Sequence, residues 1–179
     1  MQDTGFWSEP ALDEAASASA RVPSASDIAE ATTAFTVSLI KRAVCEAAAC
    51  ASAINMSEAD LGLCVAAQLR EYGLRVAHEY AVVPHWTTSG GVRVPLAARR
   101  ADLAVWRRAE DRPEVLVELK MVTSTPPRVD DRHCRQAAAY AEIEECPCLL
   151  AVVTKGGPGT PLFEEFEPGH YGVGTGTGV

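Results

Sequence analysis

The chain has 179 residues, of which 47% are hydrophobic and 22% are charged. This is typical of one globular domain with short segments outside its core. Its apolar runs are too short to cross a bilayer, and its acidic start has no basic segment followed by an apolar one. We therefore expect neither a membrane span nor a secretion signal, and we predict an intracellular protein, cytoplasmic or, in a eukaryote, nuclear.

The net charge of −8 argues against broad electrostatic attraction to nucleic acid. The charge is uneven, however. Residues 93–135 hold ten Lys or Arg against seven Asp or Glu, whereas the segments before and after are acidic. The middle of the chain is therefore its only basic stretch.

The first half of the chain shows two helical patterns followed by a strand. The predicted elements are a flexible lead-in over 1–30, a helix over 33–53, a helix from the N-cap Ser57 to about Tyr72, a strand over 74–83, and a loop up to residue 98. Gly73 ends the second helix, and Pro84 stops the strand.

The second half predicts a hairpin, a helix and a buried strand. Its elements are strands over 99–106 and 114–122 joined by the polar turn 107–113, a helix capped by Asp130 or Asp131 and running to Glu145, a buried strand over 148–154, and a loose glycine-rich tail over 166–179. The domain is expected to span 31–165. The order α-α-β-β-β-α-β predicts an α/β fold with a mixed central sheet flanked by helices.

The six cysteines show no zinc-site spacing; they are Cys45, Cys50, Cys64, Cys134, Cys146 and Cys148. We predict reduced, structural thiols, as is usual inside cells. Cys45, Cys64 and Cys134 lie on alanine-rich helical stretches, where a free cysteine acts as a small buried apolar residue.

Two charges interrupt an otherwise apolar strand. Glu118 and Lys120 are two residues apart, so they project from the same face. Asp102 is a further carboxylate among apolar residues of the preceding strand, and the hairpin can bring it beside Glu118. Two adjacent carboxylates repel, and a divalent cation relieves that repulsion. The alternative is a simple Glu118–Lys120 ion pair on a half-exposed strand.

The helix that follows adds polar side chains. Gln136 and Tyr140 share one face at i and i+4, and Arg132 and Arg135 lie in its first turns. A solvated amphipathic helix with Tyr140 in the core explains this pattern equally well.

These parts together resemble the PD-(D/E)xK, or restriction-endonuclease-like, nuclease superfamily, and within it the RecB-like exonuclease group. Asp102 matches the aspartate of the second core strand, and Glu118-Leu119-Lys120 matches the (D/E)-x-K of the third. Gln136 to Tyr140 matches the Q-x-x-x-Y helix motif. The resemblance covers residues 57–154, and implies a restriction-endonuclease-like fold.

The family also places a glutamate from the preceding helix at the site. Glu58 is our choice because it lies on the apolar face of its helix, although it is also an ordinary favourable residue for a helix start. Glu79, on the first strand, is the alternative. The chain departs from the pattern at Ala101, where the name-giving proline would be, and at Arg99, where the RecB-like pattern has glycine.

The resemblance implies a nuclease that hydrolyses DNA phosphodiester bonds with Mg²⁺ or Mn²⁺. Its metal ligands would be Asp102, Glu118, the Leu119 carbonyl and Glu58, and its catalytic residues would be Asp102, Glu118, Lys120, Gln136, Tyr140 and Glu58. Arg128, Arg132 and Arg135 are the expected phosphate contacts. The resemblance implies DNA rather than RNA as the partner, and a homodimer or a partner protein is a candidate for part of the DNA contact.

Two other functions fit the sequence. The first is a nuclease-fold module without catalysis that binds nucleic acid or serves in an assembly, which the acidic net charge favours. The second is an interaction protein that dimerises through the alanine-rich helix 33–53. In the loop before the hairpin, Trp86 is a candidate for stacking on a base and His85 for entering a site, but a packed tryptophan and a solvated histidine are the ordinary alternatives.

Overall fold

The computed structural model describes residues 24–54, 56–107, 110–156 and 160–169. Its elements are α1 (Ala25–Ile54), α2 (Glu58–Glu71), β1 (Arg75–Val82), β2 (His85–Thr87), β3 (Arg93–Pro95), β4 (Arg99–Trp106), β5 (Val115–Val122), α3 (Asp131–Glu144), β6 (Cys148–Thr154) and β7 (Leu162–Phe166). The predicted α/β class with a mixed sheet and flanking helices is confirmed.

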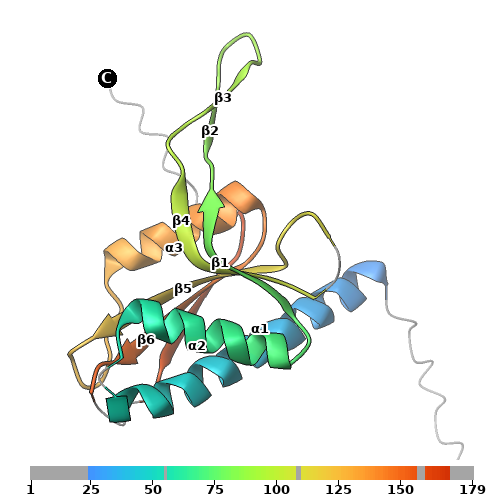
Figure 1. Cartoon of the computed structure of the whole chain (residues 1–179). Helices are drawn as coiled ribbons and strands as arrows, with labels where there is room; N and C mark the ends of the chain where they lie inside the picture. The colour runs from blue at the N-terminus through green and yellow to red at the C-terminus, as the bar shows by residue number, and fades with distance from the viewer. Residues whose placement is uncertain (1–23, 55, 108–109, 157–159, 170–179) are drawn as a thin grey trace, which may run out of the picture.

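A five-stranded sheet in the order β1-β4-β5-β6-β7 forms the centre of the domain (Figure 1). β5 and β6 run parallel, and the other neighbouring pairs are antiparallel. Helix α3 makes the crossover between the two parallel strands and lies on one face, while α1 and α2 cover the other. The sheet is therefore covered on both faces at β5 and β6, which explains why β6 is buried along its whole length.

Helix α2 begins at a capping box. The Ser57 hydroxyl accepts from the Asp60 N–H, and the Asp60 carboxylate accepts from the Ser57 N–H. The helix ends before Gly73, whose φ of +81° is the left-handed conformation that glycine allows. The predicted start and end of this helix are thus confirmed, and they place Glu58 in the first turn, facing the sheet.

Several boundaries differ from the predicted ones. α1 begins at Ala25, so the last part of the predicted lead-in is helical, while residues 1–23 lie outside the described ranges. Strand β7 ends at Phe166, which is buried, so the domain extends beyond residue 165; the predicted tail from 170 onwards lies outside the described ranges. Asp130, rather than Asp131, caps α3.

The segment predicted as a loop before β4 contains a second, two-stranded sheet. β2 and β3 pair antiparallel and extend away from the domain (Figure 1). Every residue of both strands is exposed, so no burial pattern in the sequence distinguishes them from a loop.

The cysteines are all free thiols. Cys146 and Cys148 are buried, but Cys45 and Cys64 are exposed and Cys134 is half-buried, so the prediction that the three helical cysteines fill the core was wrong for two of them. α1 buries its opposite side instead, with Ile40 and Val44 fully enclosed. None of the described helices is both long and apolar enough to span a membrane.

Candidate active site

The site lies where β4 and β5 part. The two strands pair from Leu103 and Val117 toward the hairpin turn, and the ladder stops there. Beyond that point the Leu119 N–H donates a hydrogen bond to the Asp102 carboxylate at 2.6 Å, and the Met121 N–H donates one to the Glu58 carboxylate at 2.9 Å. Two acidic side chains thus take the places that backbone carbonyls of β4 would have filled.

The gap also exposes a carbonyl oxygen to the same side chains. In an antiparallel strand the N–H and C=O of one residue point to the same side. Since the Leu119 N–H points at Asp102, the Leu119 carbonyl faces the same gap. Asp102 and this carbonyl therefore offer oxygen atoms from two strands at the gap, and Glu118 is near enough to Asp102 for their charges to interact.

Lys120 joins the carboxylates. Its ammonium group lies 2.9 Å from Glu118 Oε1 and 3.0 Å from Glu58 Oε1, and its side chain is mostly buried. The sequence left Glu58 and Glu79 as alternatives for the additional acid. Glu58 contacts both Lys120 and the β5 backbone, whereas Glu79 pairs at 3.5 Å with Arg100.

Helix α3 completes the arrangement. Gln136 Nε2 donates to Glu118 Oε1 at 2.7 Å and to the Tyr140 hydroxyl at 2.9 Å, and that hydroxyl donates to the Arg100 carbonyl at 2.8 Å. Tyr140 is buried in the core, as its alternative explanation predicted, and it also supports Gln136. Gln136, supported by Tyr140, therefore orients Glu118 from the α3 side of the sheet, whereas Glu58 contacts Lys120 from the α2 side.

Burial makes the Glu118 carboxyl group harder to ionise than an exposed one. Only 1% of the residue is exposed, and its Oε2 has no hydrogen-bond partner among the described residues. Burial, and then the charge of Asp102, raise the pKa of Glu118 to about 7, against the opposing effect of Lys120. Burial also raises the pKa of Asp102, and the Leu119 N–H and Lys120 oppose that shift.

Lys120 stays charged in this setting. Burial alone would lower the pKa of its ammonium group, but the hydrogen bond and charge of Glu118 and the charge of Asp102 outweigh burial and raise the pKa. A charged ammonium group therefore lies between the carboxyl groups of Glu118 and Glu58 and within the field of Asp102.

The donor set fits a hard divalent cation. Its atoms are all oxygens, and Mg²⁺ in proteins uses one or two carboxylates and keeps several waters. Buried Glu118 Oε2, without a partner among the described residues, is an atom that such a cation would satisfy. Across the described ranges, no group of three or more His, Cys, Asp or Glu side chains is placed to hold a metal.

Three arginines surround a hollow beside this site. The hollow has a volume of about 480 Å³ and is lined by Arg99, Arg132, Arg135, Gln136 and Tyr140. Two of the predicted phosphate contacts thus lie next to Gln136. Arg128 is exposed between β5 and α3 and is not among the lining residues.

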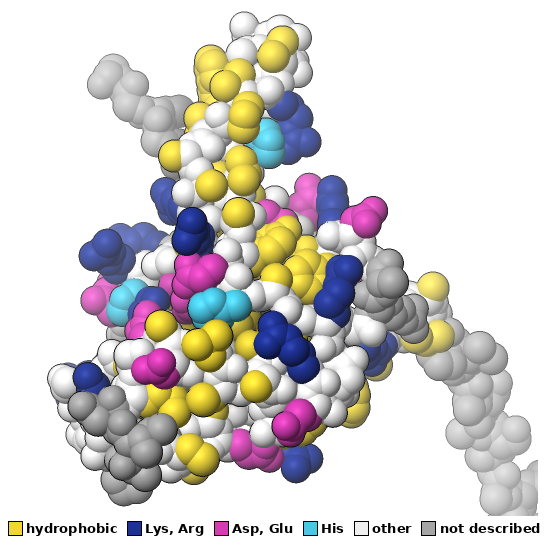
Figure 2. Space-filling model, viewed as in Figure 1, with side chains coloured by type: hydrophobic (Ala, Val, Ile, Leu, Met, Phe, Trp, Pro, Cys, Tyr) yellow, Lys and Arg dark blue, Asp and Glu magenta, His cyan; other side chains and the backbone are white. Residues whose placement is uncertain are grey.

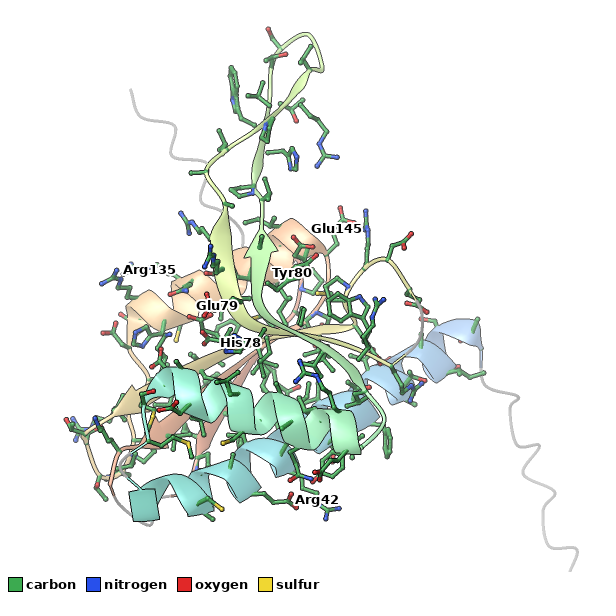
Figure 3. The ribbon with its side chains drawn as sticks, in the orientation of Figure 1. Arg42, His78, Glu79, Tyr80, Arg135 and Glu145 are labelled. Atoms are coloured by element: carbon green, nitrogen blue, oxygen red, sulfur yellow. The ribbon has the colours of Figure 1, made fainter. Side chains whose placement is uncertain are left out.

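Sequence reasoning missed Arg99, which we treated only as a departure from the glycine of the family pattern. Arg99 lies three residues before Asp102 on the same strand, a spacing that strand alternation places on opposite faces, so no sequence pattern pointed to it. Glu79 has another unusual property, a φ of 56° at the strand position opposite Asp102. Left-handed backbone at a residue other than glycine is strained and often lies near functional sites. Figure 3 shows His78 and Glu79 on β1 and Arg135 on α3.

The Tyr140 hydroxyl gives a test of how strongly this network supports the fold. Tyr140→Phe keeps the ring but removes the bonds to Arg100 and Gln136, and it should lower the free energy of unfolding by about 1–2 kcal/mol in urea titrations. Tyr72→Phe is the matched control, because the Tyr72 hydroxyl bonds Glu46 near the surface and should matter less. Equal losses in both variants would contradict a special contribution from the buried network.

The comparisons with known proteins add little. No protein-family model matches the sequence, and no curated protein matches it. Among solved structures, the chain is similar to one titled "Crystal structure of SSO0001", with a TM-score of 0.44 and 19% identity over 60% of this chain and 50% of that one. The chain thus spans half the length of that protein, and a similarity of this strength supports no conclusion about fold family or function.

Proposed function

We propose that the chain is a metal-dependent nuclease of the PD-(D/E)xK kind, with a restriction-endonuclease-like fold and DNA as its substrate. The observation that carries the proposal is the meeting of Asp102, Glu118 and Lys120 at the point where β4 and β5 part. A buried ion pair by itself stabilises a fold weakly. Here the Glu118–Lys120 pair lies beside a second carboxylate, Asp102, and beside the Leu119 carbonyl oxygen. A bound ligand explains this combination better than a purely structural ion pair does.

The fold supports this proposal without identifying the family. The sheet has three consecutive antiparallel neighbours, β1, β4 and β5, and then a helical crossover to a parallel strand. That is the arrangement implied by the sequence resemblance over 57–154. The RecB-like subgroup is further supported by Gln136 and Tyr140, which contact Glu118 and each other.

The residues divide the proposed reaction among them. Mg²⁺ or Mn²⁺, held by Asp102, Glu118 and the Leu119 carbonyl, would polarise the phosphate and lower the pKa of the attacking water. Lys120 would donate a hydrogen bond to the water or to the charge that develops on the phosphate oxygens. Glu58 would orient Lys120, as its 3.0 Å contact does already.

The remaining side chains would position the substrate. Gln136 holds Glu118, and Tyr140 holds Gln136, so the acidic side chain has a fixed orientation. Arg99, Arg132 and Arg135 would bind phosphates next to the one that is cleaved. Their local positive charge would offset part of the repulsion between DNA and a chain of net charge −8.

The first experiment compares the wild-type protein with Asp102→Ala on linear and circular, single- and double-stranded DNA. We expect cleavage with Mg²⁺ or Mn²⁺, no cleavage in EDTA, and none by the variant, because removing Asp102 takes away one of two carboxylate ligands. Cleavage that persists undiminished in Asp102→Ala would rule out this site. Activity on linear but not circular DNA would define an exonuclease.

A catalytically inactive module is the second candidate. The ion pairs of Lys120 with Glu118 and Glu58 favour it, because these three charged side chains then stabilise one another without a ligand. Folded wild-type protein that binds DNA but cuts none of the substrates with either metal would support this alternative. Size-exclusion chromatography would then test for a partner or a second copy.

A further inference from the structure

The hairpin of β2 and β3, with the turn between them, forms an arm that extends from the domain (Figure 1). Its turn is closed by bonds from the Thr88 N–H to the Val92 carbonyl and from the Gly91 N–H to the Thr88 carbonyl, both 2.9 Å. At its base the Leu96 N–H bonds the Pro84 carbonyl. The pairing is thus continuous from base to turn, and the arm is an ordered element.

The arm has two different faces. Trp86 lies opposite Val94 in the register, so their side chains share a face, and alternation adds residues 92 and 96 to it. The exposed fractions on this apolar face are 58% for Trp86, 61% for Val92, 37% for Val94 and 50% for Leu96. The other face carries His85, Thr87 and Arg93. Figure 2 shows hydrophobic side chains along the arm, with basic side chains and a histidine beside them.

The arm lacks acidic residues. Residues 80–101 contain three arginines and no Asp or Glu, in a chain whose net charge is −8. Arg93 is on the arm itself, and Arg99 stands at its base, where it lines the hollow shared with Arg132 and Arg135. The arm and its base therefore carry positive charge and no negative charge, although Arg100 pairs with Glu79, and this charge suits a polyanion.

We infer that the arm binds a single-stranded segment of nucleic acid, with Trp86 and its apolar neighbours against unpaired bases and Arg93 and Arg99 beside the phosphates. Unpaired bases present flat apolar surfaces that a duplex keeps inside its stack, and aromatic side chains bind them without regard to sequence. The inference deepens the proposed function, because it makes the substrate one with unpaired nucleotides beside the cleaved bond.

A second copy of the chain is the other occupant that an apolar face suggests. The observations favour nucleic acid, because the arm carries Arg93 on the face opposite Trp86, has no acidic residue, and leads into β4 at Arg99, which lines the hollow. A surface for self-association alone would not require this excess of positive charge beside a candidate phosphodiesterase site.

The test measures binding by fluorescence anisotropy, with the full chain in EDTA so that nothing is cut. The probes are a fluorescein-labelled oligodeoxythymidine about 20 nucleotides long and a duplex of the same length. Trp86→Ala should weaken binding of the single strand about tenfold or more, since stacking contributes about 1–3 kcal/mol per base. Trp86→Phe should retain most of the affinity. Phe35→Ala is the control, because Phe35 is an aromatic residue of similar exposure (55%) on α1.

Three results would overturn the inference. The first is equal affinity of wild type and Trp86→Ala for the single strand, and the second is an equal loss of affinity for single strand and duplex. The third is a dimer in sedimentation velocity that Trp86→Ala dissociates, which would assign the face to a second copy. Binding in EDTA is independent of catalysis. A Trp86 effect without any cleavage would refute only the nuclease proposal, and cleavage without a Trp86 effect would refute only the role of the arm.

Discussion

Replacement of Lys120 by alanine is expected to reduce DNA cleavage by at least about a hundredfold while the protein stays folded. Lys120 is the cation in direct contact with both Glu118 and Glu58. In the proposed reaction, it supplies the donor that stabilises charge on the phosphate, and loss of such a donor costs about 10²–10³ in rate. The measurement is the single-turnover cleavage rate with saturating Mg²⁺, beside a circular dichroism spectrum.

The fold should survive this change because Glu118 can become neutral. Without Lys120, the pKa of Glu118 rises further and the carboxyl group takes up a proton instead of remaining as a buried charge. Lys41→Ala is the matched control, since the Lys41 ammonium pairs with Glu165 on β7, away from β4 and β5. Full activity in Lys120→Ala would remove this residue from the mechanism.

The metal-free protein is expected to lose stability as the pH rises from about 5 to 8. Burial raises the pKa of Glu118 from 4.5 to about 7, so the folded state holds a proton that the unfolded state has released in this window. Stability therefore falls with increasing pH, by about 3 kcal/mol at most. The measurement is the free energy of unfolding in urea with EDTA at both pH values.

Glu118→Gln should remove most of this pH dependence, because the amide does not titrate. Glu164→Gln, at an exposed position of β7, is the control and should keep the wild-type slope. Asp102 contributes in the same direction, since burial raises its pKa as well. Lys120 keeps its charge throughout, because its pKa is raised. An unchanged slope in Glu118→Gln would mean that this carboxyl group is ionised in the folded protein.

The sequence predicted the elements whose residues are buried in a regular pattern. The run CLLAVVT over 148–154 is a fully buried strand because parallel β6 lies between two neighbours and beneath helices on both faces. The unusual charges of Glu118 and Lys120 were recognisable because apolar neighbours surround them. The contact of Glu118 with Gln136 was expected only from the family resemblance, because helix periodicity by itself placed Gln136 and Tyr140 on one face and no more.

Other features depend on tertiary contacts that a local pattern does not contain. β2 and β3 are short and wholly exposed, so their pairing leaves no apolar alternation against a core. The choice between Glu58 and Glu79 required knowledge of where β4 leaves β5. Cys45 and Cys64 were misplaced because alanine-rich helices offer several small faces, and only packing determines which of them faces the core.

The parting of β4 from β5 has a consequence for amide hydrogen exchange. The Leu119 and Met121 amides lie in the central sheet, yet their hydrogens are held by the Asp102 and Glu58 carboxylates rather than by a neighbouring strand. Their exchange rates should therefore respond to whatever draws those carboxylates away, while the amides of Val117 and Leu103, which lie within the β4–β5 ladder, remain protected. Two backbone positions thus serve as built-in reporters of ligand binding, without any label at the site.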